Sequence, residues 1–227
     1  MIISKKQFNI VFIIITVAIF LGIIFYKPKK MTIAHYDYTK SIQTNLKWIE
    51  SNRVIIIGDS RFKRIINERE NYSIPQNYLF IAKSATAFEW FKEEAIPKMK
   101  MLIDNKHSYH IIINMGINDI QFTQNYHKII NKYLIEFKKL EKEYPGINFY
   151  ILSINPIDEE LININYPENI RTMNKIEIFN NKLIYFSKNS KYKYCDSANN
   201  INFETLDGLH YKNTTNQEII KYILTKI

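Results

Sequence analysis

The sequence VIIIGDSR at positions 54–61 governs how the rest of the chain is interpreted. Its first four residues are apolar and β-branched, which predicts a short strand buried on both faces. The Gly-Asp-Ser that follows predicts a tight turn into a helix over residues 62–68. Ser60 would then lie at the carboxyl end of a central strand, where open α/β sheets place their ligand crevices. Taken alone, the same residues are also typical of an ordinary helix N-cap, so the interpretation depends on the other motifs.

The composition indicates one folded domain. Of the 227 residues, 46% are hydrophobic and 14% aromatic, which excludes a disordered chain. The net charge is +9, but residues 1–30 hold five lysines and no acid, so residues 31–227 carry 26 basic and 22 acidic side chains, a net +4. This mild charge, without a dense Lys/Arg stripe, argues against a nucleic-acid partner. The single cysteine, Cys195, excludes an intramolecular disulfide and a cysteine-based zinc site.

Residues 8–26 form an uncharged stretch of 19 residues, long enough to cross a bilayer as a helix. Lysines flank it on both sides, and it lacks the small-residue cleavage site of a secretory signal. We expect an uncleaved membrane anchor within residues 1–30, then a linker with one short amphipathic helix over residues 31–52, then a domain over residues 53–227. A buried core helix is the alternative for the apolar stretch. The flanking lysines alone slightly favour a cytoplasmic domain.

Strands and helices alternate along the predicted domain. This order implies βαβ units, a parallel sheet and right-handed crossovers. Strands are predicted at residues 53–57, 78–82, 109–114, 149–153 and 192–195, and further helices at about 88–104, 124–143, 171–187 and 214–225.

Glycine is scarce, and its positions indicate where the functional turns lie. Only five glycines occur, and three of them adjoin polar motifs: Gly58 before Asp-Ser, Gly116 in Gly-Ile-Asn-Asp, and Gly208 in Asp-Gly-Leu-His. We infer that these three positions need a positive φ or a close backbone approach. In a doubly wound sheet all three turns would lie at the same edge.

Together the three turns supply the parts of an activated serine. A serine hydroxyl needs a base to take its proton, and that base needs a carboxylate to fix its tautomer. Ser60, His210 and Asp207 have these chemical types, while the Ser60 amide and the Asn118 side-chain amide could stabilise a developing oxyanion. An Asp-x-x-His surface turn is the alternative for Asp207 and His210. The other histidines (His35, His107, His110 and His127) show no metal-ligand spacing, so no metal site is expected.

With these motifs in place, the chain resembles the SGNH, or GDSL-like, hydrolase superfamily over about residues 53 to 225. Gly58-Asp59-Ser60 corresponds to the first motif of that family, residues 116–119 to the third, and residues 207–210 to the fifth. The resemblance implies a flavodoxin-like, three-layer α/β/α sandwich with a five-stranded parallel sheet. It also implies ester hydrolysis or acyl transfer through an acyl-serine, without metal or cofactor.

The second motif departs from the family pattern. The family usually has a glycine after the second strand, whose amide joins the oxyanion hole, but residues 81–87 contain none. The resemblance assigns that place to Ala85. It also suggests that Arg61 and Asn155 contact substrate from the same edge; loop hydrogen bonding and a solvated helix face are the alternatives for these two residues.

The resulting hypothesis is a membrane-anchored serine esterase or acyltransferase that removes or transfers O-acyl (acetyl) groups on cell-surface polysaccharide. Family members with one N-terminal anchor commonly face outward, sometimes beside a multi-span acyltransferase, so we expect an extracytoplasmic domain despite the flanking lysines. An O-acyltransferase partner of such a multi-span protein remains an alternative. So does a catalytically silent, membrane-tethered glycan-binding or scaffold protein.

Overall fold

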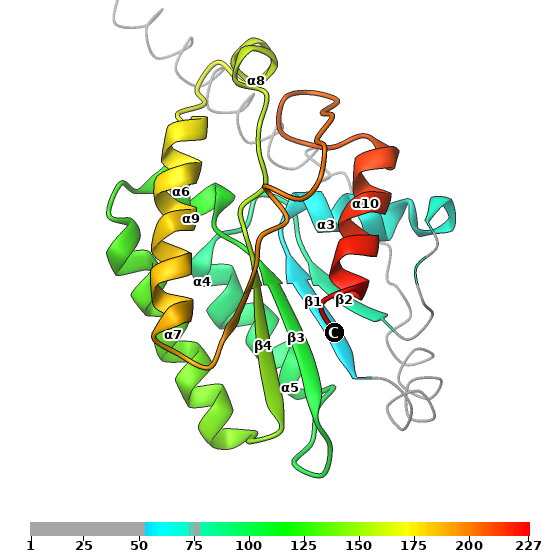
Figure 1. Ribbon diagram of the computed structural model, residues 1–227, viewed down its shortest axis with the longest axis vertical. Helices are drawn as coiled ribbons and strands as arrows, with labels where there is room; N and C mark the ends of the chain where they lie inside the picture. Colours follow the sequence, from blue (N-terminus) through cyan, green and yellow to red (C-terminus); the bar gives the residue numbers. More distant parts are fainter. Residues whose placement is uncertain (1–52, 73, 75–77) are drawn as a thin grey trace, which may run out of the picture. The chain divides into compact units, whose positions relative to one another are not determined.

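The computed structural model describes residues 53–72, 74 and 78–227, which are drawn in colour in Figure 1. The predicted anchor and the predicted linker with its short helix lie outside these residues. Within them, no helix is both long and apolar enough to span a bilayer.

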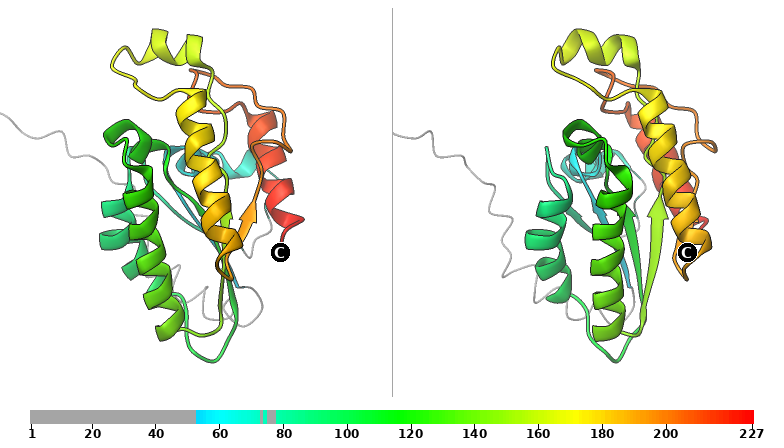
Figure 2. Two further views of the ribbon diagram at one scale, coloured as in Figure 1. Left: turned by 60° about the vertical axis from the view of Figure 1, so that its left-hand side comes forward. Right: turned by 90° about the vertical axis from the view of Figure 1, so that its left-hand side faces the viewer.

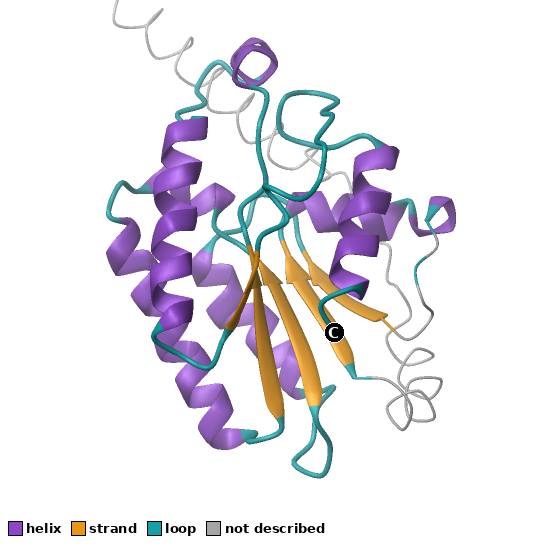
Figure 3. Ribbon diagram, in the orientation of Figure 1, coloured by secondary structure: helices purple, strands orange, loops and turns teal. Residues whose placement is uncertain are grey.

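A sheet of five parallel strands forms the centre of the described chain. The strands lie in the order β2-β1-β3-β4-β5, every neighbouring pair is parallel, and their carboxyl ends share one edge (Figure 3). This is the flavodoxin-like order, whose switch point lies between β1 and β3. The predicted five-stranded parallel sheet is therefore confirmed. The strands are β1 (Val54–Gly58), β2 (Tyr78–Ala82), β3 (Tyr109–Asn114), β4 (Ile147–Leu152) and β5 (Lys193–Cys195).

Helices cover both faces of this sheet. One apolar cluster joins one strand face to α4, α5, α7 and α9, and a second joins the opposite face to α3 and α10. In the left view of Figure 2, α7 and α10 lie on opposite sides of the strands. The three-layer α/β/α arrangement is thus confirmed. The helices are α3 (Ser60–Asn67), α4 (Phe88–Trp90), α5 (Ile96–Lys100), α6 (Ile117–Phe122), α7 (Tyr126–Glu143), α8 (Glu159–Asn165), α9 (Met173–Lys188) and α10 (Asn213–Leu224), with a 3₁₀ turn at Arg69–Asn71 and a π-helical turn at Phe91–Ala95.

Strand β1 is buried along its whole length, as its β-branched run predicts. Val54 and Ile56 pack toward α3 and α10, whereas Ile55 and Ile57 pack into the cluster on the other face. Burying each such side chain stabilises the fold by about 2 kcal/mol. The strand that leads to Ser60 is therefore among the most firmly held parts of the molecule.

The helices differ from the sequence prediction in three ways. The helix predicted over about residues 88–104 is divided into α4, the π-helical turn and α5, and it ends at Lys100. Helix α3 begins at Ser60, earlier than predicted, because the Asp59 side chain accepts the Arg61 amide at 3.0 Å and caps the helix there. Helices α6 and α8 were not predicted, because six and seven residues are too few for an apolar period to stand out.

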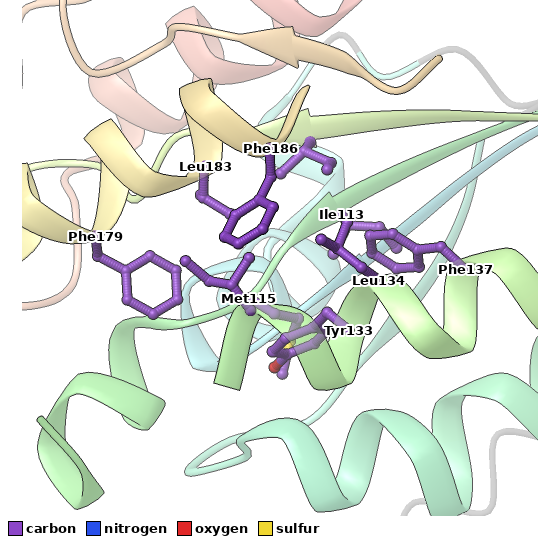
Figure 4. Close-up of a pocket in the computed structure, with 10 residues that line it drawn as sticks. Ile113, Met115, Tyr133, Leu134, Phe137, Phe179, Leu183 and Phe186 are labelled. Carbon is purple, nitrogen blue, oxygen red and sulfur yellow. The ribbon is translucent and has the colours of Figure 1, made fainter. Parts of the chain in front are cut away.

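A small apolar cavity lies between the sheet and helices α7 and α9 (Figure 4). Its volume is about 20 Å³, roughly the room that one water molecule needs. Its lining includes Ile113, Phe137, Phe179 and Leu183, and it contains none of the predicted site residues. We therefore regard it as a gap in the core packing and not as a substrate site.

Candidate active site

Ser60 lies where β1 ends and α3 begins, at the carboxyl edge of the sheet. Its backbone amide is in the first turn of α3, where amides have no partner within the helix. Gly58 is needed for close approach and not for a positive φ: a Cβ at this position would lie 2.7 Å from the Phe62 ring. Phe62 packs against the turn at Gly58, and this packing helps to fix the position of Ser60.

His210 connects Ser60 to Asp207 through both of its ring nitrogens. The His210 Nε2 atom lies 2.9 Å from the Ser60 hydroxyl oxygen, and Nδ1 lies 2.7 Å from Asp207 Oδ2. Because a carboxylate can only accept, Nδ1 carries the proton and Nε2 is left as an acceptor for the serine hydroxyl. The sequence-predicted serine, histidine and aspartate thus form one hydrogen-bonded chain.

The Asp207 carboxylate is held in the ionised form by several donors. Its Oδ1 atom accepts the backbone amides of Leu209 at 2.9 Å and His210 at 2.7 Å. Its Oδ2 atom also accepts the Tyr166 hydroxyl at 2.8 Å. Partial burial alone would raise the pKa of Asp207, but the hydrogen bonds from His210, Leu209 and Tyr166 outweigh it and lower the pKa to about 2. The carboxylate therefore stays charged beside the imidazole at neutral pH.

Helix α8 packs directly against the loop that carries Asp207 and His210. The Asp158 amide, at the N-terminal cap of α8, donates to the Gly208 carbonyl at 2.9 Å, and the Asn165 side chain donates to the Asp207 carbonyl at 3.3 Å. Gly208 has φ +90°, and a Cβ there would lie 2.1 Å from the Ile162 backbone nitrogen. Both reasons predicted for a glycine in this motif therefore apply at position 208.

The loop after β2 contains Ala85, the residue assigned to the missing glycine. Ala85 has φ +55°, and it is the one non-glycine residue with positive φ in the part of the chain that the structure describes. The Thr86 hydroxyl closes this turn by donating to the Lys83 carbonyl at 2.8 Å. Alanine thus retains the left-handed turn that glycine adopts more easily. The Ala85 amide has no hydrogen-bond partner among the described residues.

Asn118 lies in the first turn of α6, after β3, and its side chain is almost fully buried. Its Nδ2 atom donates to the Thr86 carbonyl at 2.8 Å, which links the loop after β2 to the motif after β3. Its Oδ1 atom accepts from Arg171 Nη2 at 2.8 Å. Because β2, β1 and β3 are adjacent, the structure brings the Ser60, Ala85 and Asn118 donors to the same edge of the sheet.

Two buried carboxyl groups lie in these motifs. Burial raises the pKa of Asp59. Burial also raises the pKa of Asp119 to about 6, although the Phe88 amide and the Tyr133 hydroxyl donate to its carboxylate at 3.0 and 2.9 Å. Asp119 thereby ties α6 to the start of α4 and to α7.

The structure does not place Arg61 and Asn155 as substrate contacts. Arg61 is 2% exposed and Asn155 is 1% exposed. The Arg61 guanidinium donates to the carbonyls of Leu209 and Asn155, each at 3.1 Å, and lies 4.8 Å from the centre of the Tyr211 ring. The Asn155 side chain accepts the Ser197 hydroxyl. Both residues hold loops together inside the protein, because the loops after β4 and before α10 fold over α3.

Two residues near the site, Tyr166 and Arg171, were not predicted from the sequence. Each lies in an irregular segment and reaches a residue 41 to 53 positions away, so local patterns give no sign of either contact. One signal was available for Arg171. Of the 31 basic residues only five are arginines, and Arg171 is the only arginine after position 69.

Comparison with known proteins supports the fold. No family model and no curated protein matches the sequence. Among solved structures, a candidate acylhydrolase from Bacteroides fragilis aligns with TM-score 0.65 and 15% identity, covering 83% of this chain and 94% of that one. A member of the lipolytic protein G-D-S-L family from Veillonella parvula aligns with TM-score 0.55 and 13% identity, covering 77% and 97%. The C-terminal catalytic domain of Streptococcus pneumoniae peptidoglycan O-acetyltransferase A aligns with TM-score 0.53 and 13% identity, covering 77% and 91%. At these identities the alignments show that the chain shares its fold with GDSL-type proteins.

Proposed function

We propose that this protein is a serine esterase or acyltransferase of the SGNH type. The observation that carries the proposal is the chain from the Ser60 hydroxyl through His210 to Asp207, with distances of 2.9 and 2.7 Å. This chain gives the serine a base and gives the base a carboxylate, as an activated nucleophile requires.

The geometry supports a two-step reaction. In the first step, the Ser60 oxygen bonds to the acyl carbon of an ester while its proton passes to His210 Nε2. The backbone amides of Ser60 and Ala85 and the Asn118 side-chain amide are the candidate donors to the oxyanion that forms on the carbonyl oxygen. The alcohol leaves with the proton from His210, and an acyl-serine remains. In the second step, water or a sugar hydroxyl gives its proton to His210 Nε2 and attacks the acyl carbon. The bond between the acyl carbon and the Ser60 oxygen then breaks, and the proton on His210 returns to that oxygen.

For the substrate we propose O-acyl groups, chiefly acetyl groups, on cell-surface polysaccharide. Two observations support this choice: the apolar stretch at residues 8–26 is long enough to act as an anchor, and one protein of the same fold is a peptidoglycan O-acetyltransferase. We further propose an extracytoplasmic domain, with a multi-span acyltransferase as its partner. Protease treatment of intact cells tests the orientation, because a domain that stays protected would place it in the cytoplasm.

The nucleophile is tested with Ser60→Ala, measured with p-nitrophenyl acetate and with a fluorophosphonate label. We expect turnover to fall by roughly 10³-fold or more and labelling to disappear. Ser190→Ala is the matched control, because that hydroxyl donates to a backbone carbonyl at the end of α9, and this variant should keep full activity. Turnover that survives in Ser60→Ala would contradict the proposal and favour the scaffold alternative.

Asp207→Asn tests the role of the carboxylate. It should lower the rate by orders of magnitude in a protein that still folds, because an amide no longer enforces the histidine tautomer. A glycan acceptor added to the acetyl-ester assay separates the two activities: acetylated glycan indicates a transferase, and free acetate alone indicates a hydrolase.

A further inference from the structure

Arg171 lies between α8 and α9, and its guanidinium reaches the motif that follows β3. Its Nε atom donates to the Ile117 carbonyl at 2.9 Å, and its Nη2 atom donates to Asn118 Oδ1 at 2.8 Å. Its Nη1 atom donates to Asn169 Oδ1 at 3.3 Å, within the same loop. The planar guanidinium thus donates to two consecutive residues of α6. This pairing needs the forked geometry of arginine, which the single ammonium group of lysine does not have.

These contacts decide which way the Asn118 amide faces. A guanidinium can only donate, so the amide must turn its oxygen toward Arg171. The Asn118 Nδ2 group then faces the opposite way, where one of its two hydrogens is donated to the Thr86 carbonyl at 2.8 Å. The second hydrogen of Nδ2 has no acceptor among the described residues.

We propose that Arg171 is a positioning residue, which orients and polarises the Asn118 amide toward the oxyanion formed during acyl transfer. The inference rests on the proposed function. A cation bonded to the amide oxygen draws electron density from the nitrogen, so the remaining N–H becomes a stronger donor.

The partly buried setting fits this role. Arg171 is half-buried, and burial, together with the nearby Arg61 charge, lowers the pKa of Arg171. Position 171 therefore carries its charge at some cost in solvation. The choice of arginine in a sequence that uses lysine 26 times out of 31 agrees with a need for the forked geometry.

The test is a double-mutant cycle measured with p-nitrophenyl acetate as substrate. Asn118→Ala should lower kcat by roughly 10²-fold to 10³-fold, as loss of one oxyanion donor does. Arg171→Met should lower kcat by about 10-fold to 100-fold, with KM changed by no more than about two-fold, because the contact matters most in the transition state. In the Asn118→Ala background, Arg171→Met should cause no further loss, since Arg171 acts only through that amide.

Two further variants keep the test decisive. Arg171→Lys keeps the charge but not the forked geometry, so we expect a loss of kcat smaller than that of Arg171→Met. This loss should also vanish in the Asn118→Ala background. Arg171→Lys replaces Arg171→Met in the cycle if the methionine variant does not fold. Arg64→Met is the matched control, because Arg64 forms an ion pair with Glu68 on α3, and kcat should be unchanged. An equal loss from the Arg171 variants with and without the Asn118 amide would overturn the inference, as would full activity. An inactive wild-type protein would overturn the proposed function and this inference together.

Discussion

Replacing Asp119 by asparagine should change how the stability of this protein depends on pH. The pKa of Asp119 is about 6 in the folded protein and 3.8 for an ordinary aspartate, and the side chain is 3% exposed. At about 1.4 kcal/mol per pKa unit, the difference corresponds to about 3 kcal/mol. Between about pH 4 and pH 6 the folded protein keeps this proton while the unfolded chain has lost it, so stability falls as pH rises through this window.

Asp119→Asn should lack this fall, because an amide does not ionise but can still accept the Phe88 amide. Urea unfolding followed by circular dichroism, at several pH values between about 4 and 7, gives the free energy of unfolding for both proteins. The difference between them should change by about 3 kcal/mol across the range in favour of the variant. Asp158→Asn is the control for net charge, because it removes an exposed carboxylate and leaves an oxygen to cap α8. Parallel pH curves for wild type and Asp119→Asn would refute the reasoning.

Two other substitutions test the edge of the sheet. Ala85→Gly should raise the free energy of unfolding by about 0.5 kcal/mol with activity retained, because it relieves a left-handed alanine and keeps the backbone donor. Ala87→Gly is the control, because φ at that position is −128°, and this variant should be destabilised. Equal effects of the two substitutions in thermal melts would contradict the prediction. Tyr166→Phe removes one donor from Asp207 and should raise the pKa of that carboxyl, so the variant should be less stable than wild type at about pH 5 by up to about 1 kcal/mol. Since the low pKa of Asp207 contributes stability that is lost as pH falls from 3.8 to about 2, this gap should close during acid titration, and a gap that persists to low pH would point to lost packing.

The sequence predicted the parts of this fold that depend on local composition. A run of four β-branched residues can hardly be anything but a buried strand, and β1 is buried at every position. Ser60, Asn118 and His210 each come two residues after a glycine. A Cβ at Gly58 would collide with Phe62, and Gly116 and Gly208 have positive φ. Because parallel strands end at one edge, the prediction of a doubly wound parallel sheet was enough to expect these motifs there.

The parts that could not be predicted depend on contacts between distant segments. Arg61 was expected to contact substrate, with a solvated helix face as the alternative, because the sequence of a short helix gives no sign of the loops that cover it. Tyr166 and Arg171 act through hydrogen bonds that cross 41 and 53 positions of sequence. The left-handed turn at Ala85 depends on its neighbours, because alanine alone does not favour that conformation.

The buried guanidinium of Arg61 also has a consequence for the order in which the protein is built. Its two acceptors, the carbonyls of Asn155 and Leu209, lie 94 and 148 residues further along the chain. While the protein emerges from the ribosome, this cation lacks the second of these acceptors until Leu209 has been made, and enclosing it earlier would carry a desolvation cost of about several kcal/mol. A nascent chain that stops short of Leu209 should therefore keep β1 and α3 open to proteases, and the domain should close only after the ribosome has released the loop that precedes α10.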